Sequence, residues 1–326
     1  MFKKKPSFFY KKDFISTILV PFSWIYFLCF FIANLRFSRP KMICKKTICI
    51  GNIVVGGSGK TPICIVLCEA LSKKFKNICF ITKGYGRKSR EHFFVSSEDS
   101  YIFDVNDIGD EPKLLGEYSD VFVVKKRNKV KCSNYDLAIC DDGFFDKSIY
   151  TDCKIAVFDG NFFIGNGRML PAGPLRSTMK YLKKADFVII TNNVNDEIQQ
   201  KIKVVKKYVH EDNILCANLV VTSKHDKTKK YFAFSGIGEN GKFLKSLNNY
   251  GIEIVGFVGF EDHQEYSDEI LDCLQNDFIK SGADKLITTT KDFVKLSSHF
   301  RFLDKVDVFK ISYEIADIDK IISFVL

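Results

Sequence analysis

Residues 47–62 read TICIGNIVVGGSGKTP, and this stretch decides the fold. Its apolar start at residues 48–50 predicts a buried strand, and the residues from Lys60 to Ala70 predict a helix. A glycine-rich turn separates the two. A strand, a glycine-rich turn and a helix start, in this order, are the context of a phosphate-binding Walker A loop. The stretch therefore predicts an α/β fold that binds a nucleotide.

Six residues of this loop are expected to bind the nucleotide: Gly56, Gly57, Ser58, Gly59, Lys60 and Thr61. Glycines allow backbone N–H groups to face phosphate oxygens without a clash from a Cβ atom. Lys60 brings a positive charge to the β- and γ-phosphates of ATP, and the Thr61 hydroxyl can bind Mg²⁺. The complete Walker pattern has another glycine where this chain has Val54, and an ordinary glycine-rich turn is the alternative interpretation.

A second apolar strand ends in two carboxylates. Residues 135–142 read YDLAICDD, so Asp141 and Asp142 follow the strand directly. The carboxyl ends of parallel strands are where ligands bind in α/β folds, which makes this a Walker B arrangement. Either carboxylate could hold Mg²⁺, directly or through water, and a surface turn after a strand is the alternative.

Two adjacent acids precede a proline between these segments, at residues 108–112, which read IGDEP. Asp110 and Glu111 in this position are typical of a helix N-terminus, where carboxylates accept hydrogen bonds from free backbone N–H groups. From these residues alone, the structural role is the preferred interpretation.

Apolar runs that predict strands alternate with helical stretches, and the runs lie at residues 77–82, 121–124, 136–140, 155–159 and 187–191. This alternation predicts a doubly wound, mostly parallel sheet. After a polar stretch at residues 222–230, the pattern restarts and predicts a second, smaller α/β unit. We therefore expect residues 41–222 to form the P-loop core and residues 223–326 to form a smaller C-terminal domain. The active site is expected in the cleft between them.

An apolar segment near the N-terminus, residues 14–35, contains no charged residue. Its length is close to what a bilayer span needs, but basic residues flank both of its ends, whereas a spanning helix usually has its basic bias on one side. Residues 1–40 are therefore expected to form a helix that associates with the cytoplasmic face of a membrane. A spanning helix, a buried core helix and a signal peptide are the alternatives.

The formal net charge of +10 suits a phosphorylated or membrane-surface partner. Nucleic acid would also fit this charge, but the chain has no nucleic-acid-binding motif, so we expect no nucleic-acid partner. Eleven cysteines are present, many of them inside apolar runs. We interpret them as reduced core residues, because a free cysteine behaves as a small apolar side chain.

Taken together, these segments resemble the tetraacyldisaccharide 4′-kinase family, whose members phosphorylate an acylated disaccharide 1-phosphate, a membrane-bound precursor of lipid A. The resemblance runs from the apolar N-terminal segment to Leu296 and includes the GNIVVGGSGKTP loop without its first glycine. The other matching motifs are KGYGRKSR (83–90), GDEP (109–112), DDGF (141–144), GNGRMLPAGPLR (165–176), FSGIG (234–238), EDH (261–263) and TTTKDFVKL (288–296). The resemblance implies a kinase that uses ATP and Mg²⁺ at the cytoplasmic leaflet of the inner membrane.

Roles for single residues follow from the same resemblance. Asp110 matches the acid that deprotonates the sugar 4′-hydroxyl, and His263 is its expected partner in a catalytic dyad. A carboxylate alone is a weak base toward an alcohol, because its ordinary pKa lies near 4. Arg127 is expected to contact the lipid's phosphate, and Lys60 is expected to act in catalysis. The ligands of Mg²⁺ are expected to be Thr61, Glu111, Asp141 and Asp142.

The chain departs from the family's pattern after Phe144, where Phe145 and Asp146 replace Gln-His. Any polar role of that Gln or His is therefore absent or relocated. In GNGRMLPAGPLR, both Arg168 and Arg176 could contact phosphates or pair with acids. Pairing with an acid is the preferred role for Arg176, and the choice stays open for Arg168.

A membrane-associated P-loop NTPase that acts as a switch is the competing function, because the same loop would serve it. A GTPase switch should carry Asn/Thr-Lys-x-Asp for guanine. Here Thr290, Lys291 and Asp292 are consecutive, so that spacing is missing. A membrane-bound binding module with a degenerate nucleotide site is disfavoured by the intact Lys60 and Thr61.

Overall fold

The strand expected at residues 48–50 is β1 (Lys46–Gly51), which lies in the middle of a nine-stranded sheet. The strand order is β13-β8-β7-β6-β1-β5-β2-β4-β3, and only the edge strands β3 and β13 pair antiparallel. The other strands are β2 (Ile78–Thr82), β3 (Phe93–Val95), β4 (Asp120–Val123), β5 (Leu137–Cys140), β6 (Cys153–Asp159), β7 (Phe187–Thr191), β8 (Ile214–Val221) and β13 (Ile311–Ile315). The predicted α/β class with a mostly parallel sheet is confirmed.

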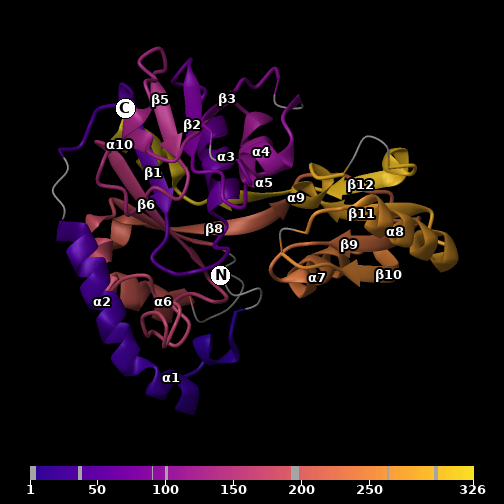
Figure 1. Cartoon of the computed structure of the whole chain (residues 1–326), viewed down its shortest axis with the longest axis horizontal. Coiled ribbons are helices and arrows are strands. Elements are labelled where there is room, and N and C mark those ends of the chain that lie inside the picture. The colour runs from indigo at the N-terminus through magenta and orange to yellow at the C-terminus, as the bar shows by residue number, and fades with distance from the viewer. Residues whose placement is uncertain are drawn as a thin grey trace.

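This computed structural model describes residues 5–35, 39–89, 91–99, 102–191, 198–262, 264–296 and 300–326. Its two lobes are joined by extended segments (Figure 1). We call the part around the nine-stranded sheet the first lobe. The second lobe contains a four-stranded parallel sheet in the order β10-β9-β11-β12. Its elements are β9 (Lys230–Ser235), α7 (Asn240–Tyr250), β10 (Glu253–Gly259), α8 (Asp268–Ser281), β11 (Lys285–Thr289), α9 (Thr290–Phe293) and β12 (Val306–Phe309).

Both faces of the large sheet are buried, because its central strands consist mainly of apolar residues and are buried at every position except Lys46. Ile48 and Ile50 face one core, and Cys49 between them faces another. The first core lies under α3 (Lys60–Leu71), α4 (Val105–Ile108), α5 (Asp110–Gly116) and α10 (Ile318–Val325). The opposite face is covered partly by the N-terminal segment and α6 (Ile198–Val205). Eight of the eleven cysteines are buried free thiols, in agreement with their interpretation as reduced core residues.

Residues 311–326 do not join the smaller C-terminal domain that was predicted for residues 223–326. β13 pairs antiparallel with β8 of the first lobe, from Ile311 opposite Val221 to Ile315 opposite Ala217. The following helix, α10, buries Ile321 and Val325 in the core of the first lobe. The second lobe is therefore an insertion between β8 and β13. The short β13 segment gave no local signal for this, because strand pairing over a long sequence separation is not visible in the pattern of one strand.

The apolar N-terminal segment forms two helices, α1 (Phe14–Ile18) and α2 (Val20–Leu35). Asp13 begins α1 with a capping box in which Asp13 and Ser16 exchange side-chain-to-backbone hydrogen bonds. Pro21 is tolerated because it lies in the first turn of α2, where its missing N–H has no helical acceptor. Among the described residues, no helix is both long and apolar enough to cross a bilayer.

Replacement of Ile321 by alanine tests the assignment of α10 to the first lobe. Ile321 is 0% exposed, so we expect Ile321→Ala to lower the free energy of unfolding by about 2–5 kcal/mol in urea denaturation. Ile279 on α8 is 61% exposed, and Ile279→Ala serves as the matched control with an expected change of less than about 0.5 kcal/mol. Equal stability of the two variants would contradict the assignment.

Candidate active site

The glycine-rich loop connects β1 to α3 as the sequence predicts. Gly56 has φ +102° and Gly59 has φ +77°, and side chains other than glycine rarely adopt these angles. Gly59 is also the N-cap residue of α3, which places Lys60 and Thr61 in the first turn of that helix. The free N–H groups of this first turn point into the loop, which is the arrangement that binds phosphate at helix N-termini.

Val54 shows why the first Walker glycine is absent. It forms an antiparallel bridge with Leu175, and the N–H of the adjacent Val55 donates to the carbonyl oxygen of Pro174 at 2.9 Å. The Val54 side chain is buried in the apolar core on the face of the sheet that the N-terminal segment and α6 cover. A glycine here would leave a gap under the 165–176 loop, so this position has a packing role.

The Walker B carboxylates lie beside the start of α3. Thr61 Oγ1 donates to Asp141 Oδ2 at 3.2 Å, and Lys60 Nζ lies 3.9 Å from Asp142 Oδ1. Burial opposes the ionisation of Asp142, but Lys60 and then Arg176 outweigh it and hold its pKa below the usual value. Burial raises the pKa of Asp141. The structure thus brings together the two motifs that the sequence predicted separately.

The residues around Asp141 fit a magnesium ion. Asp141 Oδ1 is buried and has no hydrogen-bond partner within the described part of the chain, so this oxygen can accept a cation. Burial, and then the negative charge of nearby Asp141, raise the pKa of Glu111 to about 7. No group of three or more His, Cys, Asp or Glu side chains that could hold a metal is found in the described ranges. Mg²⁺ does not need one, because it is commonly bound by one or two carboxylates together with waters and substrate phosphates.

Asp110 is the first residue of α5, and its carboxylate points toward the second lobe. Its side chain is almost completely buried, at 3% exposure, and Oδ2 lies 3.3 Å from Lys291 Nζ and 3.7 Å from Lys295 Nζ. His263, its expected dyad partner, lies outside the described residues. The two lysines of the TTTKDFVKL motif had no role predicted from the sequence. Their spacing of four residues was the available signal, because residues at this spacing share a face if the segment is helical.

Arg127 lies beneath the Walker B residues. Its side chain is fully buried, Nη1 donates to Asp146 Oδ2 at 3.2 Å, and Nη2 donates to the backbone carbonyl oxygen of Asp141. The predicted contact with a lipid phosphate would require Arg127 to leave these partners. Asp146, one of the two departures from the family's pattern, is thus used to hold an arginine that supports the Walker B turn.

The two arginines of the 165–176 loop pair with protein groups. Arg176 Nη1 donates to Asp142 Oδ1 at 3.2 Å, as the preferred interpretation held, and its guanidinium lies 5.1 Å from the ring centroid of Phe145. Arg168 Nη1 donates to Ser16 Oγ and Thr17 Oγ1, both at 3.0 Å. Arg168 therefore holds α1 against the loop, while Arg176 holds a Walker B carboxylate.

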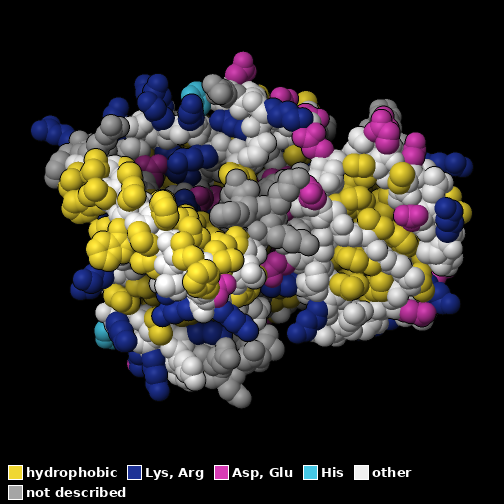
Figure 2. Space-filling model, turned by 60° about the horizontal axis from the view of Figure 1, so that its bottom comes forward, with side chains coloured by type: hydrophobic (Ala, Val, Ile, Leu, Met, Phe, Trp, Pro, Cys, Tyr) yellow, Lys and Arg dark blue, Asp and Glu magenta, His cyan; other side chains and the backbone are white. Residues whose placement is uncertain are grey.

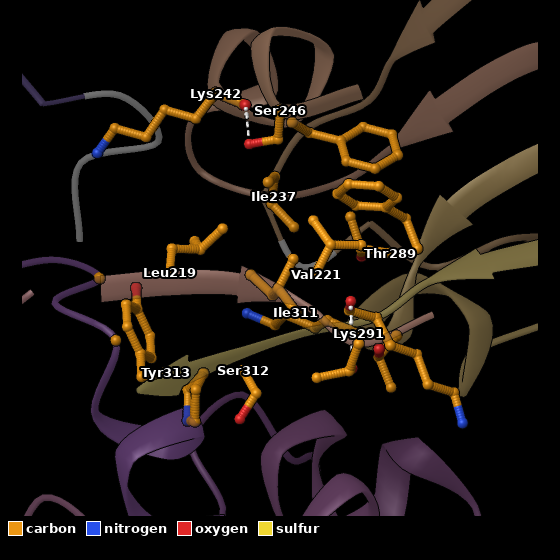
Figure 3. A pocket seen from close by; sticks show the side chains of 18 of the residues that line it. Leu219, Val221, Ile237, Lys242, Ser246, Thr289, Lys291, Ile311, Ser312 and Tyr313 are labelled. Carbon is orange, nitrogen blue, oxygen red and sulfur yellow. Dashed lines mark hydrogen bonds between the residues drawn. The ribbon is translucent and has the colours of Figure 1, made fainter. Parts of the chain in front are cut away.

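A cleft of about 1070 Å³ opens between the glycine-rich loop and the second lobe. Figure 3 shows side chains that line it, with Lys242 and Ser246 of α7 at the top of the view and Ile311, Ser312 and Tyr313 of β13 toward the bottom. At one end, Lys242 of α7 donates to Asp159 at 2.7 Å and also contacts Glu239. Lys5 of the N-terminal segment bonds Glu239 at 3.0 Å, and its stem lies where a Cβ on Gly56 would be. Contacts between the lobes are thus formed beside the phosphate loop.

Comparison with known proteins gives a consistent result. The chain matches the family described as Tetraacyldisaccharide-1-P 4′-kinase over residues 15–326. The tetraacyldisaccharide 4′-kinase of Rickettsia bellii is 34% identical over 308 residues, which cover 93% of this chain and 92% of that protein. The Rickettsia canadensis protein of the same name is 36% identical over 296 residues, with coverages of 89% and 87%.

A solved structure is also similar over nearly the whole chain. The crystal structure of the LpxK protein from Aquifex aeolicus, described as an "apo" form in complex with ATP, superimposes with a TM-score of 0.74 at 25% identity. The similarity covers 95% of this chain and 98% of that one.

The packing role of Val54 predicts that restoring the Walker glycine will harm the protein. Val54→Gly removes a buried side chain and adds backbone freedom, so we expect the free energy of unfolding to fall by roughly 2–4 kcal/mol without nucleotide. Gly57→Ala is the control, because a Cβ there meets no atom within 4 Å. Urea denaturation of both variants measures the difference. Val54→Gly that is as stable as the native chain would refute the packing role.

Proposed function

The chain belongs to the tetraacyldisaccharide-1-P 4′-kinase family, and from this premise we propose how its residues perform the reaction. The chain transfers the γ-phosphate of ATP to the 4′-hydroxyl of an acylated disaccharide 1-phosphate, a precursor of lipid A. The observation that carries the proposal is the approach of the two motifs, in which Thr61 donates to Asp141 and Lys60 lies 3.9 Å from Asp142. Beside them, Lys291 lines the same cleft as the glycine-rich loop and pairs with Asp110.

In the proposed reaction, the 4′-oxygen forms a bond to the γ-phosphorus while the bond from that phosphorus to the β–γ bridging oxygen breaks. The bridging electron pair leaves with ADP, and the hydroxyl proton passes to Asp110. Lys60 and the loop N–H groups neutralise charge on the phosphates, which is most of what such a transfer requires. Thr61, Asp141 and Glu111 or Asp142 would hold Mg²⁺, which would further neutralise phosphate charge.

We also propose that α1 and α2 lie in the cytoplasmic leaflet of the inner membrane. A contiguous apolar surface on one face of the molecule supports this (Figure 2). Its exposed side chains on the two helices are Phe14, Ile15, Ile18, Phe22, Trp24, Ile25, Phe27, Leu28, Phe31, Ile32 and Leu35. An apolar surface of this kind marks an interaction site. Exposed Lys11 and Lys12 precede it, and exposed Arg39 and Lys41 follow it, where they can meet lipid phosphates.

The opposite side of α2 is fixed to the active-site loops, which links the membrane to the chemistry. Ser23 Oγ donates to the carbonyl oxygen of Met169 at 2.8 Å, and Tyr26 OH donates to the carbonyl oxygen of Arg176 at 3.1 Å. Phe30 packs on Phe145, with ring centroids 5.5 Å apart. A helix in the membrane surface would therefore hold the Walker B side of the cleft close to a lipid acceptor.

Transfer of labelled phosphate from γ-labelled ATP to the acylated disaccharide 1-phosphate tests the kinase function. We expect transfer by the native chain and a loss of at least about 100-fold in Lys60→Ala, because that side chain neutralises phosphate charge. Lys45→Ala is the control, since Lys45 lies on the surface and pairs with Asp136. ATP hydrolysis that ignores the acceptor would instead support the switch function.

The single tryptophan of the chain, Trp24, reports on membrane contact, because it lies on α2 and is 74% exposed. Vesicles that contain an anionic phospholipid should shift its fluorescence to shorter wavelength. Lys11→Gln and Lys12→Gln should each weaken binding about fivefold, since a basic residue near an anionic surface contributes about 1 kcal/mol. If anionic vesicles do not change the emission of Trp24, the membrane proposal is contradicted.

A further inference from the structure

Lys291 enters the active site from the second lobe. It follows β11 at the start of α9, where Thr289 caps the helix by accepting a hydrogen bond from the Asp292 N–H. Its ammonium lies 3.3 Å from Asp110 Oδ2 and 3.7 Å from Asp262 Oδ1. The pair with Asp110 therefore joins the carboxyl end of a strand in one lobe to the N-terminus of a helix in the other.

The two oxygens of Asp110 have different surroundings. Oδ1 accepts the N–H of Glu111 at 3.1 Å, which belongs to its own helix, whereas Oδ2 lies beside Lys291. A buried carboxylate whose two oxygens are both held has a fixed orientation. Lys291 is 25% exposed and lines the same cleft as Gly57, Ser58 and Gly59. Lys291 thus connects the buried Asp110 carboxylate to the cleft that the phosphate loop also lines.

Lys295 differs from Lys291 although both approach Asp110. Lys295 Nζ lies 3.7 Å from Asp110 and 3.6 Å from Asp292, and its side chain is almost completely buried. Asp292 is itself fixed by hydrogen bonds from Tyr266 at 3.1 Å and Thr289 at 2.7 Å. Lys295 therefore belongs to the internal packing of the turn that follows α9, and Lys291 is the lysine of this motif that lines the cleft.

The charge of Lys291 is secured by its neighbours. Burial opposes the charge, but Asp110, Asp262 and Glu111 outweigh it and raise the pKa of Lys291. The side chain is therefore a permanent cation at neutral pH, and it can hold a carboxylate in one place. A displacement of about 1 Å in a reacting group can reduce a rate about 100-fold. The orientation of the Asp110 carboxylate should therefore affect the rate of phosphoryl transfer.

We propose that Lys291 is a positioning residue for phosphoryl transfer, which orients the Asp110 carboxylate toward the acceptor hydroxyl across the boundary between the lobes. The proposal rests on the kinase function and on Asp110 as the base. In this arrangement the carboxylate is oriented only when the two lobes are close together, because the first lobe supplies Asp110 and the second lobe supplies Lys291.

Steady-state transfer assays on single and double variants test this role. We expect Lys291→Met to lower kcat about 100-fold with the KM for ATP changed less than about twofold, because Lys291 acts through Asp110. Lys291→Arg keeps the charge and should recover most of kcat. Lys285→Met is the matched control: Lys285 lies on β11, has a similar exposure of 30% and pairs with Asp307 at 2.6 Å outside the active site. Its kcat should equal that of the native chain.

The double variant Asp110→Asn/Lys291→Met separates positioning from direct action. If Lys291 acts through Asp110, the double variant should be no slower than Asp110→Asn alone. The inference would be overturned if the losses of kcat in the two single variants multiplied in the double variant, or if Lys291→Met kept a native kcat. A loss in Lys285→Met as large as that in Lys291→Met would also overturn it. Each of these results would leave the kinase function intact. A native kcat in Asp110→Asn would overturn both the base and its positioning residue, and absence of transfer by the native chain would overturn the function itself.

Discussion

The parallel pairing of β1 with β5 is the constraint on which the active site depends. Cys49 lies opposite Cys140, so both strands end at the same edge of the sheet. The loop after β1 leads to Lys60 and Thr61, and the turn after β5 carries Asp141 and Asp142. Because the register aligns these ends, the hydroxyl of Thr61 reaches Asp141 at 3.2 Å. A shift of one residue would reverse the faces of the strand and separate a phosphate-binding cation from its metal-binding carboxylates.

Other parts of the first lobe support this edge. Arg127 holds the backbone of Asp141 from below, and Arg176 holds the carboxylate of Asp142 from the side. Asp146 and Phe145, which replace the family's Gln-His, have become the partners of these two arginines. The two residues that depart from the family's pattern thus both contact the arginines that support the Walker B turn, and Phe145 also contacts Phe30 of α2.

Much of the first lobe could be predicted from sequence, because its central strands are apolar runs and its loops carry glycines and acids in a known order. β1, α3 and the Asp141–Asp142 pair follow from local pattern. The inserted position of the second lobe could not be predicted, since it depends on the pairing of Ile311 with Val221. The contact between Asp110 and Lys291 has the same cause: neither residue carries a local sign of the other, and only the approach of two lobes brings them to 3.3 Å.

The insertion has a consequence for how the protein is made. A nascent chain that has reached Val221 holds every parallel strand of the large sheet, but β8 is still an uncovered edge, and such edges invite pairing with other chains. β13 covers β8 only after residues 230–309 have left the ribosome. The inserted lobe is therefore synthesised in full before the first lobe is complete, and the large sheet gains its edge strand β13 only after that lobe has emerged.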